Sequence, residues 1–150
     1  MVTGYQQYAR TRIETAGPEQ LLIMLYDGAL RFLRAAEAAV NAQPPSFEEY
    51  ERQIERARDI LNELMNTTNF EAGEIAQNLW RIYEYCSFRL VQAALRRDAA
   101  AIGEVRGIIA EIREAFVQAA LIVRKQAGAP DPVSEPRIPM AVGQGLNTVG

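Results

Sequence analysis

Apolar residues recur at helical spacing in four long stretches of the chain. With 3.6 residues per turn, apolar positions that alternate steps of three and four gather on one face of a helix. The stretches run from Pro18 to Asn41, from Phe47 to about Asn66, from about Glu74 to Arg97, and from Asp98 to about residue 126. The predicted core lines include Tyr50, Ile54 and Leu61 in the second stretch and Ile82, Cys86 and Leu90 in the third. We see no sustained two-residue alternation with hairpin turns, so the pattern predicts no sheet.

The residues at the beginnings of these stretches suit helix N-termini. Pro18 fits the first helical position, where its missing N–H costs nothing. Ser46 with Glu49 forms a capping box, and Asp98 is a good N-cap. The connections are short, which favours antiparallel neighbours. We therefore predict an all-α fold, an antiparallel up-down four-helix bundle over residues 18–126.

Two segments lie outside this bundle. Residues 1–17 show too little regular pattern for a helix, and we expect them to pack on the bundle as a plug for a groove. The apolar side chains available for that contact are Val2, Tyr5, Tyr8 and Ile13. Residues 127–150 hold four prolines and four glycines, so we expect a tail that is mostly extended or disordered.

Composition narrows the classes of function. A chain of 150 residues suits one domain, and its content of 49% hydrophobic and 23% charged residues is that of an ordinary globular protein. The net charge of −3 argues against a nucleic-acid partner, because domains that bind nucleic acid usually carry a basic excess.

The content of histidine and cysteine limits the chemistry that the chain can perform. It has no histidine and one cysteine, which removes the usual general base, the commonest metal ligand and any internal disulfide. We expect no cofactor and no metal. The N-terminus does not resemble a secretory signal, and no apolar run is long enough for a bilayer, so we expect a cytoplasmic protein without membrane insertion.

Three further features have ordinary structural interpretations. Glu48, Glu51 and Glu55 lie near arginines on one helix, which is typical of a solvated, salt-bridged surface. Cys86 falls on a core line and is expected to be buried. Gly28 interrupts a helix, and a close approach of a second helix is the expected reason.

The stretch from Glu74 to Arg97 carries more apolar surface than a bundle helix needs. Turning 100° per residue puts a second apolar set about 140 to 220° away from the core line. This set consists of Trp80, Phe88, Val91 and Leu95. The last stretch has a second apolar line too, at Ile108, Ala115 and Ile122. Three explanations stay open: cover by the chain's own N-terminal segment, cover by a partner, or ordinary scattered exposure.

Several sequence motifs resemble one family. The run TAGPEQLLIMLYDGALRF at residues 15–32 is similar to the opening helix of the flagellar secretion chaperone FliS family. The run YQQ at 5–7, the run ARDILNEL at 57–64, and the run GEIAQNL at 73–79 with the tyrosines that follow it agree with the same family. The resemblance spans about residues 5–126. It departs at Gly17, where the family usually has Ser or Thr, and at Ala72, where a glycine is common.

The resemblance implies a function. Members of this family bind the C-terminal region of flagellin, which is disordered until it forms a helix in the filament. They prevent premature polymerisation in the cytosol and present flagellin to the membrane export gate. The family's gate-docking positions correspond here to Tyr5 and Val2. The predicted cargo groove rests on helical geometry instead. It consists of Trp80, Phe88, Val91 and Leu95, with Ile108 and Ile122 as secondary candidates.

Two other classes of protein compete with this interpretation. A small all-helical enzyme resembling chorismate mutase would need arginines lining a closed pocket. The arginines in question project away from the predicted core lines: Arg31, Arg34, Arg52 and Arg56. A self-associating structural bundle would instead pack the second apolar face of the helix over Glu74–Arg97 on a copy of itself.

Overall fold

The computed structural model describes residues 17–126, with residue 70 described by its backbone alone. This part of the chain forms four α helices and one short 3-10 helix, and it contains no strand. The elements in chain order are α2 (Pro18–Asn41), α3 (Phe47–Thr67), η1 (Phe70–Ala72), α4 (Glu74–Arg96) and α5 (Ala99–Gln126). The predicted all-α fold is confirmed. The expectations for residues 1–16, with Val2, Tyr5, Tyr8 and Ile13, and for residues 127–150 lie outside the described residues.

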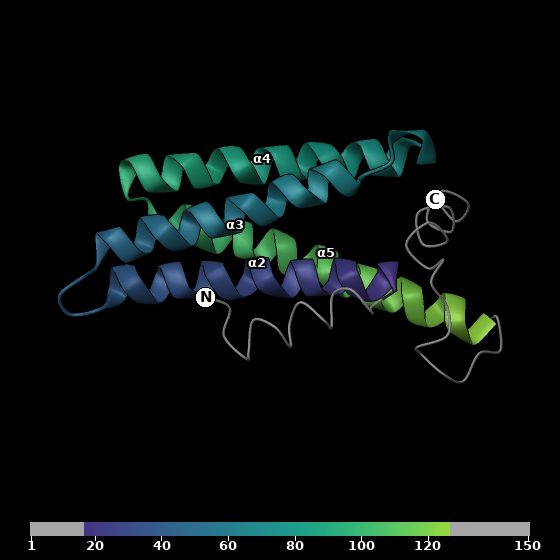
Figure 1. Ribbon diagram of the computed structural model, residues 1–150, viewed down its shortest axis with the longest axis horizontal. Coiled ribbons are helices and arrows are strands. Elements are labelled where there is room, and N and C mark those ends of the chain that lie inside the picture. The colour runs from purple at the N-terminus through teal and green to yellow at the C-terminus, as the bar shows by residue number, and fades with distance from the viewer. Residues whose placement is uncertain (1–16, 127–150) are drawn as a thin grey trace, which may run out of the picture.

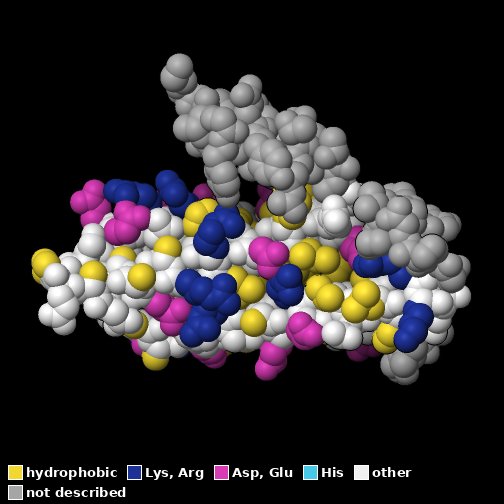
Figure 2. All heavy atoms as spheres, turned by 90° about the horizontal axis from the view of Figure 1, so that it is seen from below, with side chains coloured by type: hydrophobic (Ala, Val, Ile, Leu, Met, Phe, Trp, Pro, Cys, Tyr) yellow, Lys and Arg dark blue, Asp and Glu magenta, His cyan; other side chains and the backbone are white. Residues whose placement is uncertain are grey.

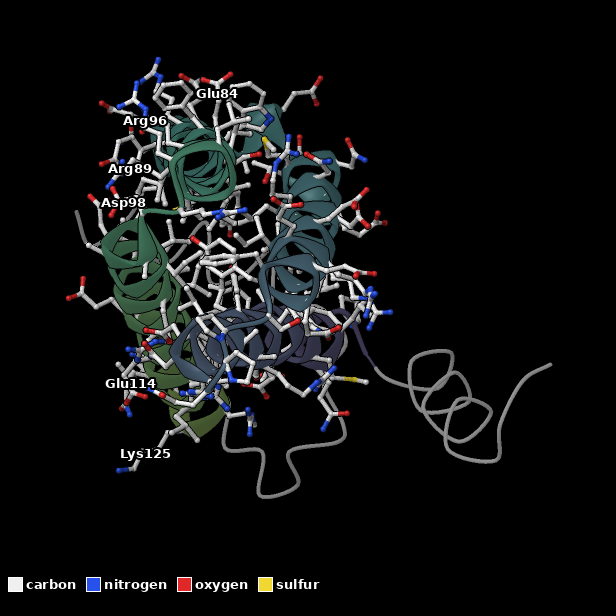
Figure 3. All side chains as sticks on the ribbon, turned by 90° about the vertical axis from the view of Figure 1, so that its left-hand side faces the viewer. Glu84, Arg89, Arg96, Asp98, Glu114 and Lys125 are labelled. Atoms are coloured by element: carbon white, nitrogen blue, oxygen red, sulfur yellow. The ribbon has the colours of Figure 1, made fainter. Side chains whose placement is uncertain are left out.

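The four helices form an elongated antiparallel bundle (Figure 1). Viewed along its axis, α4 lies at the top, α3 on one side, α5 on the other, and α2 at the bottom (Figure 3). Each helix packs against its two neighbours in this ring. The largest fully buried side chains come from all the α helices, and they include Tyr26, Leu33, Ile54, Leu64, Leu90 and Ile109.

The predicted helix starts match the structure. Pro18 begins α2 after Gly17, which offers no side-chain cap. The Ser46 hydroxyl accepts a hydrogen bond from the Glu49 backbone N–H at 3.4 Å, and the Asp98 carboxylate accepts one from the Ala100 N–H at 3.1 Å. The Glu49 carboxylate, however, contacts Arg52 and Gln53 rather than turning back to Ser46. The predicted capping box is therefore formed in one direction.

Ion pairs connect α2 to α5 along their length. Glu19 contacts Arg124 at 2.6 Å near one end, and Glu37 contacts Arg106 at 2.7 Å toward the other. Asp27 and Arg113, at 2.5 Å, lie between them. Sequence patterning gave no sign of these pairs, because their partners are far apart along the chain.

Two small buried residues, Gly28 and Cys86, have the roles predicted for them. A Cβ built on Gly28 would lie 2.9 Å from the Ile60 Cδ1, so α2 and α3 approach each other closely at this glycine. Cys86 is fully buried in the core. Burial, with a smaller contribution from the charge of Glu104, raises the pKa of the Cys86 thiol to about 12. The thiol is therefore an unreactive core group.

Candidate functional site

Helix α4 has a core face, an outward face and two flanks. Its core face is buried and consists of Tyr83, Cys86, Leu90 and Ala93. Its outward face points away from the bundle, as the labelled side chains of Glu84 and Arg96 indicate (Figure 3). Ile82, which the periodicity assigns to the core line, is 36% exposed, because it lies at the edge of that face. Each flank of α4 faces a different neighbour, α3 or α5.

The flank toward α5 is closed by polar contacts. The Tyr85 hydroxyl donates to the Glu104 carboxylate at 2.7 Å, and the Arg89 Nε donates to the same carboxylate at 2.6 Å. These two hydrogen bonds, that of Tyr85 first, hold the pKa of Glu104 below its ordinary value. Arg89 also lies 3.9 Å from Asp98. This network joins α4 to α5.

The flank toward α3 contains an open apolar groove. It has a volume of about 330 Å³, and we call it the α3–α4 groove. Its lining residues are Glu51, Ile54, Glu55, Arg58, Val91, Ala94 and Leu95. Ile54 is 2% exposed and belongs to the core, whereas Leu95 is 81% exposed. The groove therefore runs from the packed interior to an apolar side chain that stands in solvent.

Two further contacts join α3 to α4 or to its C-cap. The Arg58 Nε lies 3.4 Å from the Ser87 Oγ, one turn before Val91. Helix α4 ends at Arg96, and its C-cap Arg97 has the left-handed conformation at a φ of 51°. The Arg97 guanidinium lies 3.8 Å from the centre of the Phe47 ring, a cation–π contact back to the start of α3.

The groove brings together two of the six predicted site residues, Val91 and Leu95. Phe88 is 57% exposed on α4 but does not line the groove. Trp80 is half-buried and lies about 16 Å along the helix from Val91. Periodicity placed these four side chains on one side of α4, and the structure distributes them between its α3 flank and its outward face.

The two predicted site residues on α5 lie apart from the groove. Ile108 is half-buried and packs against the core of the bundle. Ile122 is 55% exposed near the end of α5, where its neighbour Leu121 is 47% exposed. Because α5 packs on the opposite flank of α4 from α3, neither residue contributes to the α3–α4 groove.

The α3 side of the groove was not predicted from the sequence. The pattern of charges predicts one salt-bridged surface for Glu48, Glu51 and Glu55. Glu48 does pair with Arg52, at 3.3 Å. Glu51 and Glu55, however, form no ion pair with another residue of the described range, and they line the groove instead. The sequence did contain a signal for this position on the helix. Glu51 directly follows Tyr50, and Glu55 directly follows Ile54, so both glutamates border the predicted core line of α3.

The opposite side of the bundle has a mixed surface. Seen from below, hydrophobic side chains are interspersed with basic and acidic ones (Figure 2). The four arginines that an enzyme pocket would need are all exposed: Arg31, Arg34, Arg52 and Arg56. The guanidinium of Arg31 lies 5.2 Å from the centre of the Phe32 ring, and that of Arg56 lies 5.9 Å from it. Arg31 and Arg56 thus flank the half-buried Phe32, and none of the four arginines lines the α3–α4 groove.

Two other kinds of site are absent from the described part of the chain. Within residues 17–126, no cluster of three or more acidic or cysteine side chains has the arrangement that holds a metal ion. Over the same range, none of the helices combines the length and the apolar character that crossing a bilayer requires.

The described residues define a class of protein, an all-α four-helix bundle with an apolar groove open to solvent. The chain matches the model of the family described as "Flagellar protein FliS" over residues 1–123. It is 33% identical to the flagellar secretion chaperone FliS of Bacillus subtilis over 121 residues, which cover 81% of this chain and 89% of the relative. The chain belongs to the FliS family.

Relatives from other bacteria agree. Identity to the flagellar secretion chaperone FliS of Salmonella typhimurium is 34% over 122 residues, covering 77% of this chain and 89% of the relative. Identity to the flagellar secretion chaperone FliSB of Pseudomonas aeruginosa is 31% over 114 residues, which cover 75% of this chain and 89% of the relative. Family membership assigns the chain a chaperone role in flagellar export and not an enzymatic one, which sets aside the chorismate-mutase interpretation.

Proposed function

We propose that this chain binds the C-terminal region of flagellin in the bacterial cytosol, prevents its premature polymerisation and delivers it to the flagellar export apparatus. The observation that carries the proposal is the open α3–α4 groove on a member of a chaperone family. Leu95, on its wall, is 81% exposed, and Val91 beside it is half-buried. Apolar side chains held in this way are typical of a docking surface.

The physics of such a complex fits the needs of export. An amphipathic helix laid into an apolar groove is a common mode of peptide recognition. Full burial of one aliphatic side chain contributes about 1.5 to 3 kcal/mol. A disordered cargo loses conformational entropy as it orders, which offsets much of this gain and keeps binding reversible. Reversible binding is required because the cargo must leave for export.

The cargo contact extends beyond the groove in this proposal. Phe88, on the outward face of α4, is one turn from Val91 and lies on the path of a helix that continues past the groove. Trp80, Ile108 and Ile122 remain candidates for contacts with more distant parts of the same disordered segment. A long flexible ligand can reach several such positions on one bundle.

Contact with the export gate is assigned to the N-terminal segment. The family resemblance supports Val2 and Tyr5 as the gate-docking pair and leaves Tyr8 and Ile13 as further plug residues. All four lie outside the described residues, so this part of the proposal rests on sequence alone.

Binding of flagellin to variants of the groove tests the proposal. We expect the full chain to bind flagellin and to lose this binding when the flagellin C-terminal region is deleted. Val91→Ser with Leu95→Ser should weaken binding at least tenfold in calorimetry, since about 1.4 kcal/mol of lost burial is enough. Leu121→Ser is the matched control, because Leu121 is 47% exposed outside the groove.

Two outcomes would contradict the proposal. One is intact flagellin that does not bind the wild-type chain at tens of micromolar. The other is equal weakening by the groove variant and the Leu121 control. Sedimentation of the free chain addresses the self-associating bundle: we expect a monomer, whereas a stable dimer that excludes flagellin would favour the structural class.

A further inference from the structure

The two rims of the α3–α4 groove differ in chemistry. The α4 rim is apolar and consists of Val91, Ala94 and Leu95. The α3 rim carries the carboxylates of Glu51 and Glu55, both exposed and one helical turn apart. Residues four positions apart on a helix are neighbours at about 6 Å, so the two carboxylates form a short acidic edge above the apolar wall.

The groove lining keeps a net negative charge. Arg52, the adjacent basic residue of α3, is held by Glu48 and Glu49. Arg58 is the one cation among the lining residues, and its Nε is 3.4 Å from the Ser87 hydroxyl, so two carboxylates and one guanidinium leave the lining with a charge of −1. Within the described part of the chain, neither Glu51 nor Glu55 has an ion-pair partner. The outward face of α4 adds a further carboxylate at Glu84 (Figure 3).

We infer that the α3–α4 groove selects a cationic amphipathic helix, with apolar side chains against Val91 and Leu95 and lysine or arginine side chains over Glu51 and Glu55. The inference rests on the proposed function in so far as the natural occupant is a segment of the exported cargo. Two helices have the same rise per residue, so cations four positions apart on the occupant match the spacing of the two carboxylates.

The apolar wall and the acidic edge have separate roles in this complex. Burial of apolar surface supplies most of the affinity, and it accepts any amphipathic segment of suitable size. The carboxylates select against acidic occupants, because an occupant with acidic residues on the same edge brings like charges together. They also fix which side of the occupant faces α3.

Binding of three designed peptides to the full chain tests the inference. The peptides are 18 residues long and share one leucine face, and they carry two lysines, two glutamines or two glutamates at edge positions four apart. We expect affinity in the order lysine, glutamine, glutamate by fluorescence anisotropy. The ratio between the extremes should be about tenfold at low salt, because each exposed pair changes by a modest amount. High salt should reduce this ratio of affinities, because it screens the charges.

A matched pair of variants isolates the acidic edge. Glu51→Gln with Glu55→Gln should remove the preference while the leucine face still binds. Asp59→Asn with Glu63→Gln removes the same charge from exposed positions of the same helix outside the groove, and it should leave the preference intact. This control separates local recognition from the general effect of net charge.

Three results would overturn the inference: equal affinity for the lysine and glutamate peptides, equal loss of preference in both variants, or no binding of the lysine peptide. The outcome is distinct from that of the proposed function. If flagellin binds and the peptides show no charge order, the inference alone fails. If the charge order holds and flagellin does not bind, the proposed function alone fails.

Discussion

The hydroxyl oxygens of Tyr26 on α2 and Tyr83 on α4 lie 2.7 Å apart, with one hydroxyl donating to the other. The two side chains are 1% and 2% exposed. The ring of Tyr26 also meets Phe116 of α5 edge-on, at 6.0 Å between ring centres. The pair therefore joins two helices on opposite sides of the bundle and reaches a third. Burial raises the pKa of both tyrosines, so they stay protonated at neutral pH.

Removal of one hydroxyl of this tyrosine pair should lower the free energy of unfolding, because the other hydroxyl stays buried without its partner. Tyr83→Phe leaves the Tyr26 hydroxyl buried without this partner, and we expect a loss of about 1 to 3 kcal/mol in the free energy of unfolding. The double variant Tyr26→Phe with Tyr83→Phe should lose less than the sum of the two single losses, because it leaves no orphaned hydroxyl. Urea denaturation measures all four chains. Additive losses would contradict the pairing.

The contact of Gly28 with Ile60 makes a prediction about coupling. Alanine is favoured over glycine inside a helix by about 1 kcal/mol. A Cβ at position 28 would lie 2.9 Å from the Ile60 Cδ1, however, so Gly28→Ala forces that methyl group to move. We expect Gly28→Ala to stabilise the chain more in an Ile60→Val background, which lacks the Cδ1, than in wild type. Equal effects in both backgrounds, measured by thermal unfolding, would show that the close approach is unimportant.

Burial should decide which ion pair between α2 and α5 matters for stability. The side chains of Glu19 and Arg124 are 5% and 17% exposed, whereas those of Asp27 and Arg113 are 48% and 33% exposed. Arg124→Met leaves a buried carboxylate without its partner and should cost about 3 kcal/mol. Arg113→Met should cost at most about 1 kcal/mol. Guanidinium denaturation compares the two, and equal losses would contradict this ranking.

The contribution of Glu104 should depend on pH. Its pKa is lowered from an ordinary value of 4.5 by hydrogen bonds from Tyr85 and Arg89, so the folded state favours the charged form. The resulting stability is present above the unfolded pKa and is lost as the pH falls through the folded one. We expect Glu104→Gln to be less stable than wild type at pH 7 and to approach it by pH 3. A difference in melting temperature that stays constant between these values would contradict the assignment.

Helical periodicity and capping residues predict the helices and most of their core lines. The predicted boundaries of α2 and the start of α3 coincide with the observed ones. The predicted core line of α3 includes Tyr50, Ile54 and Leu61, all of which are buried. These features are local, because helical periodicity and capping depend on residues within a turn or two of one another. The second apolar face of α4 is predicted from the sequence for the same reason, because it too follows from local helical periodicity.

Contacts between helices determine which surfaces become a site. Periodicity gives the direction of a side chain around its own helix axis but says nothing about which helix lies beside it. Packing makes Val91, Ile54 and Glu51 line one groove, and it places Ile108 against the core. A groove consists of side chains from two helices, so it exists only once contacts between distant parts of the chain close the bundle.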